Sequence, residues 1–326
     1  MLSESLPRPG TKQAYVSLSM FPGGFITLPE KSSVSPSTDD TKRTVPSMAF
    51  LVSHPGFAGK TSEVQKSIRM MFDLGLRSSA TDYSEKQQLH LENRVPYALG
   101  PSIAEQLARG DLSSSSDIDV VLLSHVHYDH NGDPQHFPSS EFIVGAGSCD
   151  VLKNGLTGSG SHQHFQADLL PANRTRELPL ANDSDAKFRL SVHDSVIESR
   201  WSPLGPFPAA MDIFGDSSVY VVDSPGHLPG HINLLCRVGP LSWVYLGGDS
   251  CHDTRLLSGE KEISTWQDDK GTIMCIHLDR SAAKETLKRI SRLGALQDCK
   301  VQIIMAHDWE WYEKHKDRCF PEQLVF

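Results

Sequence analysis

The sequence has no long hydrophobic run, no cysteine pair and no excess of positive charge. No stretch of the 326 residues approaches the roughly 20 apolar residues that a membrane-spanning helix requires. The first residues, MLSESLPRP, lack the apolar run of a signal peptide. The six cysteines are scattered without a C-x-x-C pair, so we interpret them as free thiols. We therefore expect a cytoplasmic protein with no membrane partner.

The charge balance of the chain is acidic. It contains 31 lysines and arginines against 40 aspartates and glutamates, a formal net charge of -9 at pH 7. Because binding of nucleic-acid phosphates draws on lysine and arginine, this balance predicts no nucleic-acid partner. We expect a small-molecule substrate, and a chain that is a monomer or a homodimer.

Local patterns predict several strands. The alternating segment 15–28 predicts a hairpin that turns at the Pro22-Gly-Gly sequence, and the polar segment 31–44 predicts a surface loop. Apolar runs predict further strands at 48–52, 68–72, 120–123, 142–144, 218–222, 232–237, 242–246 and 301–305.

Two helices are predicted among these strands. One lies near 102–108, where Gly110 is a stop signal, and the other covers 281–293, where apolar residues recur at helical spacing. Strands mixed with helices exclude all-α and all-β architectures. Three long segments read as loops that shape a binding site: 77–101, 145–217 and 251–280.

The segment 124–130, SHVHYDH, concentrates metal-binding side chains directly after an apolar strand. His125 and His127 are two residues apart, which places both imidazoles on one face of an extended backbone. Asp129 and His130 can reach the same point once the chain turns. Imidazole nitrogen and carboxylate oxygen are zinc ligands, so this run predicts a metal site in preference to a polar surface loop.

Three more candidate ligands follow apolar strands. His227 comes after a Ser-Pro-Gly turn, Asp249 after Gly-Gly, and His307 after the run VQIIMA. A single histidine after a strand is more often a core or surface residue than a ligand. Ligand types at four strand ends of one chain favour the metal interpretation, and a carboxylate such as Asp249 can bridge two cations.

The order of these motifs resembles that of the metallo-β-lactamase superfamily. Within it the chain is most similar to N-acyl homoserine lactonase-like and fungal lactamase-like hydrolases, because the run PGHLPGHINL at 225–234 and the Phe320-Pro321 pair are typical of the lactonase branch. The resemblance covers about 45–322. It implies a single α/β domain over 1–326, an αβ/βα sandwich of two mixed sheets flanked by helices.

The resemblance also implies a cofactor of two zinc ions per chain and a role for each ligand. Asp73, in the sequence Asp-Leu-Gly, would orient ligands through hydrogen bonds. The implied ligands are His125, His127 and His227 for one ion, Asp129, His130 and His307 for the other, and Asp249 between them.

Such a centre predicts hydrolysis of a lactone or lactam. Two zinc ions with a shared water present hydroxide at neutral pH for attack on an acyl carbon, and Asp129 is a candidate to carry the proton. A thioester hydrolase, either like glyoxalase II or biosynthetic, remains an alternative, as does an iron-dependent relative. A non-catalytic metal-binding module is less favoured, because structural zinc sites are closed and rich in cysteine.

One position departs from the lactonase pattern. Three residues after the bridging aspartate, lactonases of this kind usually have a tyrosine that helps to polarise the substrate carbonyl, and this chain has His252. We predict that His252 is catalytic, with a loop histidine that points elsewhere as the alternative. His162 and His164, in the middle segment, are interpreted as loop residues and not as metal ligands.

Overall fold

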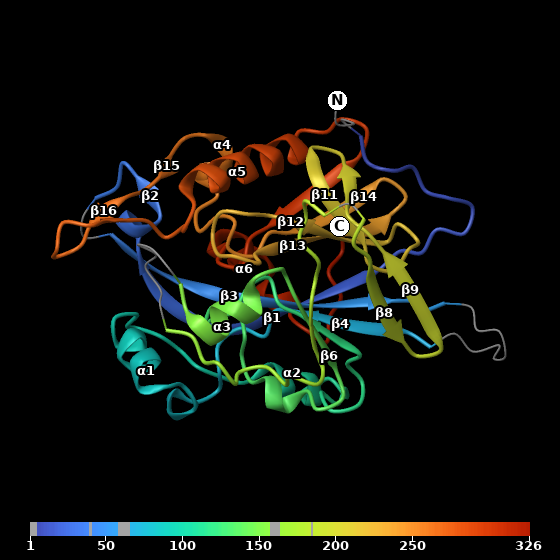
Figure 1. Cartoon of the computed structure of the whole chain (residues 1–326), viewed down its shortest axis with the longest axis horizontal. Coiled ribbons are helices and arrows are strands. Elements are labelled where there is room, and N and C mark those ends of the chain that lie inside the picture. The colour runs from blue at the N-terminus through green and yellow to red at the C-terminus, as the bar shows by residue number, and fades with distance from the viewer. Residues whose placement is uncertain (1–4, 39–40, 58–65, 157–163, 184) are drawn as a thin grey trace.

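A computed structural model describes residues 5–38, 41–57, 66–156, 164–183 and 185–326. In this part of the chain two mixed sheets of six strands each lie face to face, with helices on their outer sides (Figure 1). The expected αβ/βα sandwich is confirmed. The first sheet, in spatial order, consists of β1 (Ser17–Pro29), β3 (Lys42–His54), β4 (Ile68–Phe72), β5 (Val120–Leu122), β6 (Glu141–Val144) and β7 (Thr175–Glu177). The second consists of β10 (Ser202–Leu204), β11 (Phe207–Asp212), β12 (Val219–Asp223), β13 (Ile232–Gly239), β14 (Ser242–Leu246) and β18 (Lys300–Ile304).

The main core lies between the two sheets. Val52, Met70 and Leu122 of the first sheet and Val221 and Val244 of the second are all fully buried in one cluster. These strands therefore read as nearly continuous apolar runs, because each sheet is covered on both faces.

Helices cover the outer faces of the sandwich. In Figure 1, α5 and α4 lie beyond the second sheet, and α1, α2 and α3 lie beyond the first. Both predicted helices are confirmed. Among the described residues, none of the helices has the length and apolar character of a membrane span. The helices are α1 (Glu85–Glu92), α2 (Ile103–Arg109), α3 (Ser148–Asn154), α4 (Arg255–Ser258), α5 (Arg280–Gly294) and α6 (Trp309–His315).

The predicted hairpin at 15–28 is wrong. This segment is the continuous strand β1, which pairs with β3 on both sides of the Pro-Gly-Gly sequence. Pro22 pairs with Met48 and Phe25 with Pro46, so β1 has one extra residue and forms a bulge. A Cβ atom on Gly23 would lie 2.4 Å from the carbonyl oxygen of Ser47, so the bulge requires a glycine there for close packing.

The three long segments contain more regular structure than their composition predicts. Residues 145–217 hold α3 and five strands, 77–101 hold α1, and 251–280 hold α4 and three very short strands. The polar segment 31–44 contains a two-residue strand and the start of β3. The additional two-stranded pairs are β2 (Val34–Ser35) with β15 (Glu262–Ile263), β8 (Phe188–Val192) with β9 (Ser195–Ser199), and β16 (Trp266–Gln267) with β17 (Ile273–Met274).

Candidate metal centre

The segment 124–130 leaves the buried strand β5 and crosses the edge shared by both sheets. Its backbone is fixed on the first sheet by a hydrogen bond from the amide of Leu74 to the carbonyl of His130, 2.8 Å long. The amide of Ile232, in the second sheet, donates to the carbonyl of Ser124 at 2.8 Å. All seven residues of the segment are buried, so its polar side chains face one another and not solvent.

The other candidate ligands follow three strands of the second sheet. β12 and β14 are each antiparallel to β13, and β18 is parallel to β14, so β12, β14 and β18 end at the same edge. His227, Asp249 and His307 come shortly after these three ends. The sheet topology therefore brings residues that are distant in sequence to the place where segment 124–130 emerges.

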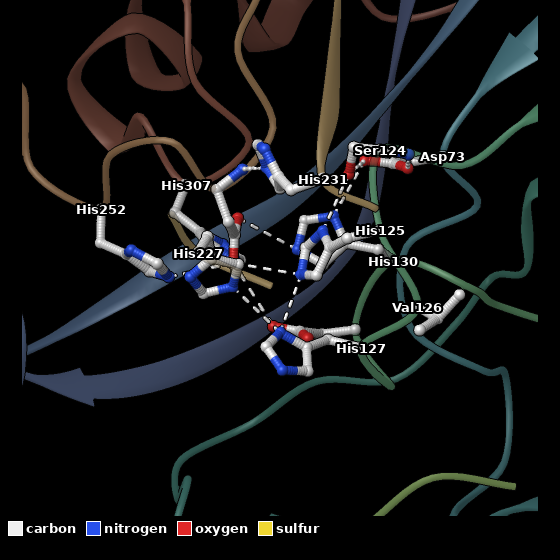
Figure 2. Close-up of polar contacts among 12 residues, drawn as sticks. Asp73, Ser124, His125, Val126, His127, His130, His227, His231, His252 and His307 are labelled. Atoms are coloured by element: carbon white, nitrogen blue, oxygen red, sulfur yellow. Dashed lines mark hydrogen bonds and ion pairs between the residues drawn. The ribbon is translucent and has the colours of Figure 1, made fainter. Parts of the chain in front are cut away.

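Three histidines point toward one another on one side of this cluster. His125 Nε2 lies 2.8 Å from His127 Nδ1, and His127 Nδ1 lies 3.0 Å from His227 Nε2 (Figure 2). Asp249 Oδ2 lies 3.7 Å from His125 Nε2 and 3.4 Å from His227 Nε2. These four residues form the first group of nitrogen and oxygen atoms close enough to share a metal ion.

A second group lies on the other side of the same carboxylate. Asp249 Oδ1 is 3.1 Å from His130 Nε2 and 3.2 Å from His307 Nε2. Asp129 Oδ2 is 3.6 Å from His307 Nε2 and completes this group. Asp249 thus directs one oxygen to each group. The structure brings all seven sequence-predicted ligands together.

The donor atoms of the cluster fit a pair of divalent ions. Nε2 of His130, Nε2 of His307 and Oδ1 of Asp249 are buried and converge on one another at 3.1–3.2 Å, but without the geometry of a hydrogen bond within the described residues. Buried polar atoms that lack a well-formed hydrogen bond are costly, and a cation between these atoms would satisfy them. Imidazole nitrogens and carboxylate oxygens suit zinc and related divalent metals. The buried histidine and aspartate groups are consistent with a dinuclear metal site.

Partners outside the cluster orient several of the ligand histidines. His130 Nδ1 lies 2.9 Å from Asp73 Oδ2, His125 Nδ1 lies 3.0 Å from the Ser124 hydroxyl, and His307 Nδ1 donates to the carbonyl of Pro46 at 2.7 Å. A hydrogen bond at one ring nitrogen fixes which nitrogen faces the metal. Asp73 occupies the orienting position that the sequence resemblance implied.

Burial and charge set the protonation of the cluster. Burial lowers the pKa of His125 and His227 well below the ordinary value, and lowers the pKa of His127 to about 4. Neutral imidazole is the form that binds a metal. Burial alone would raise the pKa of Asp249, but the neighbouring histidines, His130 foremost, hold it well below its usual range. These four ligands are therefore in the form that binds a cation at neutral pH. Burial alone would lower the pKa of His130 and His307, but Asp249 beside them raises it, so these two rings must release a proton when a cation binds.

His252 faces the cluster from the loop after β14. Its Nε2 lies 3.0 Å from Asp249 Oδ2, and its ring is stacked on His307 with centroids 5.4 Å apart (Figure 2). It lines a cavity of about 140 Å³ together with Arg43, Thr254, His307, Trp309 and other residues. His252 does not point away from the site, although its catalytic role stays a prediction.

Two further residues, His277 and Phe165, lie near the centre and were not predicted from the sequence. His277 Nδ1 lies 3.3 Å from His227 Nδ1, and Phe165 stacks on His127 with centroids 5.9 Å apart. The only sequence signal for His277 was its place two residues before Asp279, which caps α5. His162 lies outside the described residues, and His164 belongs to none of the metal-capable groups found in them.

Comparison with curated proteins identifies the family, although no family model matches the chain. Cytochrome P450 monooxygenase mpaDE' of Penicillium brevicompactum is 29% identical over 285 residues, which are 82% of this chain and 30% of the relative. The chain thus spans under a third of the length of this relative. Gamma-lactamase MBL2 of Gibberella moniliformis is 30% identical over 186 residues, covering 56% of this chain and 70% of the relative. The chain belongs to the metallo-β-lactamase superfamily.

Solved structures show the same superfamily fold. A quorum-quenching N-acyl homoserine lactone lactonase aligns over 96% of this chain and 100% of its own, with a TM-score of 0.62 and 19% identity. AidC, a dizinc quorum-quenching lactonase, aligns over 94% of this chain and 92% of its own, with a TM-score of 0.54 and 15% identity. The chain therefore has the sandwich fold of those structures.

Proposed function

We propose that this protein is a dinuclear zinc hydrolase that opens a cyclic ester or amide, a lactone or a lactam. The observation that carries the proposal is the position of Asp249 between two buried ligand groups, with Oδ2 toward one and Oδ1 toward the other. Seven histidine and aspartate ligands around two ions leave coordination positions for water and substrate, which a closed structural site does not.

In this proposal the residues around the two ligand groups have separate tasks. Two zinc ions held here would polarise a substrate carbonyl and lower the pKa of a bound water toward neutrality. The carboxylate of Asp129 lies at the edge of the second group, 3.6 Å from His307 Nε2, where it can take the proton of the attacking water and return it to the leaving oxygen or nitrogen. His252 and His307 line the adjoining cavity, so a small carbonyl substrate in that cavity lies beside the metal ligands.

The relatives support this choice of substrate class. Among the curated relatives are gamma-lactamase MBL2 and a metallo-hydrolase, mfmC, of Annulohypoxylon moriforme, which is 28% identical over 82% of this chain. Several of the structural neighbours are lactonases. We propose a small-molecule substrate accordingly, with a monomer or homodimer as the assembly.

The test combines metal analysis with a substrate screen. Protein purified without chelator should contain about two zinc ions per chain, and a panel of lactones, lactams and thioesters should show zinc-dependent ring opening of a lactone or lactam. Loss of turnover after chelation and its return with zinc would support the proposal. If thioesters are hydrolysed faster than lactones and lactams, the proposed substrate class is wrong. If the purified protein contains a single ion, or iron in place of zinc, the dinuclear zinc centre is refuted.

A further inference from the structure

His277 lies beside the candidate ligand His227 and outside the two groups that share Asp249. With His227 and His252 it forms a further set of histidines close enough to hold an ion. It is buried, its Nδ1 is 3.3 Å from Nδ1 of His227, and the two rings meet edge to face with centroids 5.2 Å apart. Nε2 of His227 faces the first ligand group, 3.0 Å from Nδ1 of His127. The contact with His277 is therefore made by the nitrogen of His227 that faces away from the group.

The backbone fixes this contact. The amide of Leu278 donates to the carbonyl of His227 at 3.1 Å, and the amide of Asp279 donates to the carbonyl of Gly226 at 2.9 Å. A Cβ atom on Gly226 would lie 2.3 Å from the amide nitrogen of Ala283, so the start of α5 packs directly on this turn. These hydrogen bonds hold together two chain segments, one with His227 and one with His277, which are about 50 residues apart in the sequence.

The hydrogen bond between Nδ1 of His227 and Nδ1 of His277 is linked to the tautomer of His227. To bind a metal, Nε2 must offer its lone pair, so the ring proton of neutral His227 resides on Nδ1. That N–H needs an acceptor, and the atom opposite it is Nδ1 of His277. His130, His125 and His307 each meet an oxygen atom at the corresponding nitrogen.

We propose that His277 is a positioning residue for the metal centre, which accepts the Nδ1 proton of His227 and so holds Nε2 toward the first ion. The inference rests on the proposed function, in which His227 is a ligand. His277 carries its own proton on Nε2, a buried atom with no hydrogen bond within the described residues. A residue that only filled space would be apolar there, because burying an unpaired polar atom is costly. A role as acceptor at Nδ1 explains why the side chain at this buried position is polar.

Two substitutions of similar size separate this role from packing. In His277→Asn the side-chain amide lies near the former position of Nδ1 and supplies an oxygen acceptor for His227. In His277→Gln the amide lies near the former position of Nε2 and leaves Nδ1 of His227 without its partner. We expect the glutamine variant to bind the first zinc about 10–100-fold more weakly than wild type, and the asparagine variant to stay within threefold.

The measurement is zinc competition with a chromophoric chelator, which gives both dissociation constants without reference to activity. The control is His54→Asn, because His54 is a buried histidine paired with Asp216 outside every metal-capable group of the described residues. Its zinc affinity should equal that of wild type. Equal affinity in the His277→Asn and His277→Gln variants overturns the inference alone. A wild-type chain that binds no zinc overturns the proposed function and the inference together.

Discussion

Replacing Asp73 with asparagine is expected to weaken the second ligand group through a residue that binds no metal. The carboxylate of Asp73 accepts three hydrogen bonds: from the amide of Ser124 at 2.6 Å, from its hydroxyl at 2.7 Å, and from His130 Nδ1 at 2.9 Å. Asp73 has a φ of 62°, which asparagine also tolerates, so the substitution leaves the backbone unstrained.

The magnitude follows from which of these bonds the amide can keep. Its oxygen still accepts from the amide of Ser124, and the Ser124 hydroxyl can rotate to accept from the new NH₂ group. His130 cannot adapt, because its Nδ1 must keep the proton while Nε2 binds the metal. One hydrogen bond to a charged group is lost, worth about 1.5–3 kcal/mol, and a factor of about 10–100 in affinity for the second ion is expected.

Two measurements check this expectation. Chelator competition gives the zinc dissociation constants, and urea unfolding of the zinc-free chain gives the free energy of unfolding. The matched control is Asp216→Asn, which removes a carboxylate from a histidine, His54, away from the ligand groups. The orienting role of Asp73 is refuted if Asp73→Asn changes the dissociation constant of each zinc ion by less than threefold. It is also refuted if the change is no larger than that in Asp216→Asn.

Substitutions at three further positions, Asp249, His252 and Gly226, test other parts of the structure. Asp249→Ala should release both ions and abolish turnover, whereas Asp216→Ala should retain both, and elemental analysis distinguishes these results. His252→Ala should lower kcat by about 10²–10³ with zinc content unchanged, and His252→Tyr should recover part of the rate on lactones, while a change below about threefold would exclude His252 from the mechanism. Gly226→Ala should lower the free energy of unfolding by about 2–6 kcal/mol, because φ is +131° and the new Cβ meets the amide nitrogen of Ala283. An unchanged midpoint of urea unfolding would contradict this packing.

The sequence predicted those strands and helices whose hydrophobic pattern follows directly from their burial. Apolar runs such as 120–123 and 242–246 correspond to strands covered on both faces, and the ligands just beyond such strands meet at one edge of the sandwich. Helix α5 was predictable because Leu287 and Ile290 lie on its buried face. These features depend on periodicity, which the order of residues records directly.

Other features depended on contacts that no local pattern records. The Pro-Gly-Gly sequence in β1 suits a turn as well as a bulge, and the partner strand β3 decides between them. Strand β8 does alternate, with Phe188 and Leu190 buried, but the polar runs NDSD at 182–185 and HDS at 193–195 on either side of it masked the signal. His277 approaches His227 through pairing of two loops, and a three-residue strand such as β7 is too short to show periodicity.

The sharing of ligands between the two sheets has a consequence for how the molecule resists unfolding. His125 follows a strand of the first sheet and His227 a strand of the second, so an ion bound by both connects the two halves of the sandwich. The ion then acts as a reversible cross-link. Because it binds the folded chain and finds no preformed site in the unfolded one, free zinc at about a thousand times its dissociation constant adds about 4 kcal/mol to the free energy of unfolding. If the bound metal is zinc, as proposed, the melting temperature should therefore rise with zinc concentration.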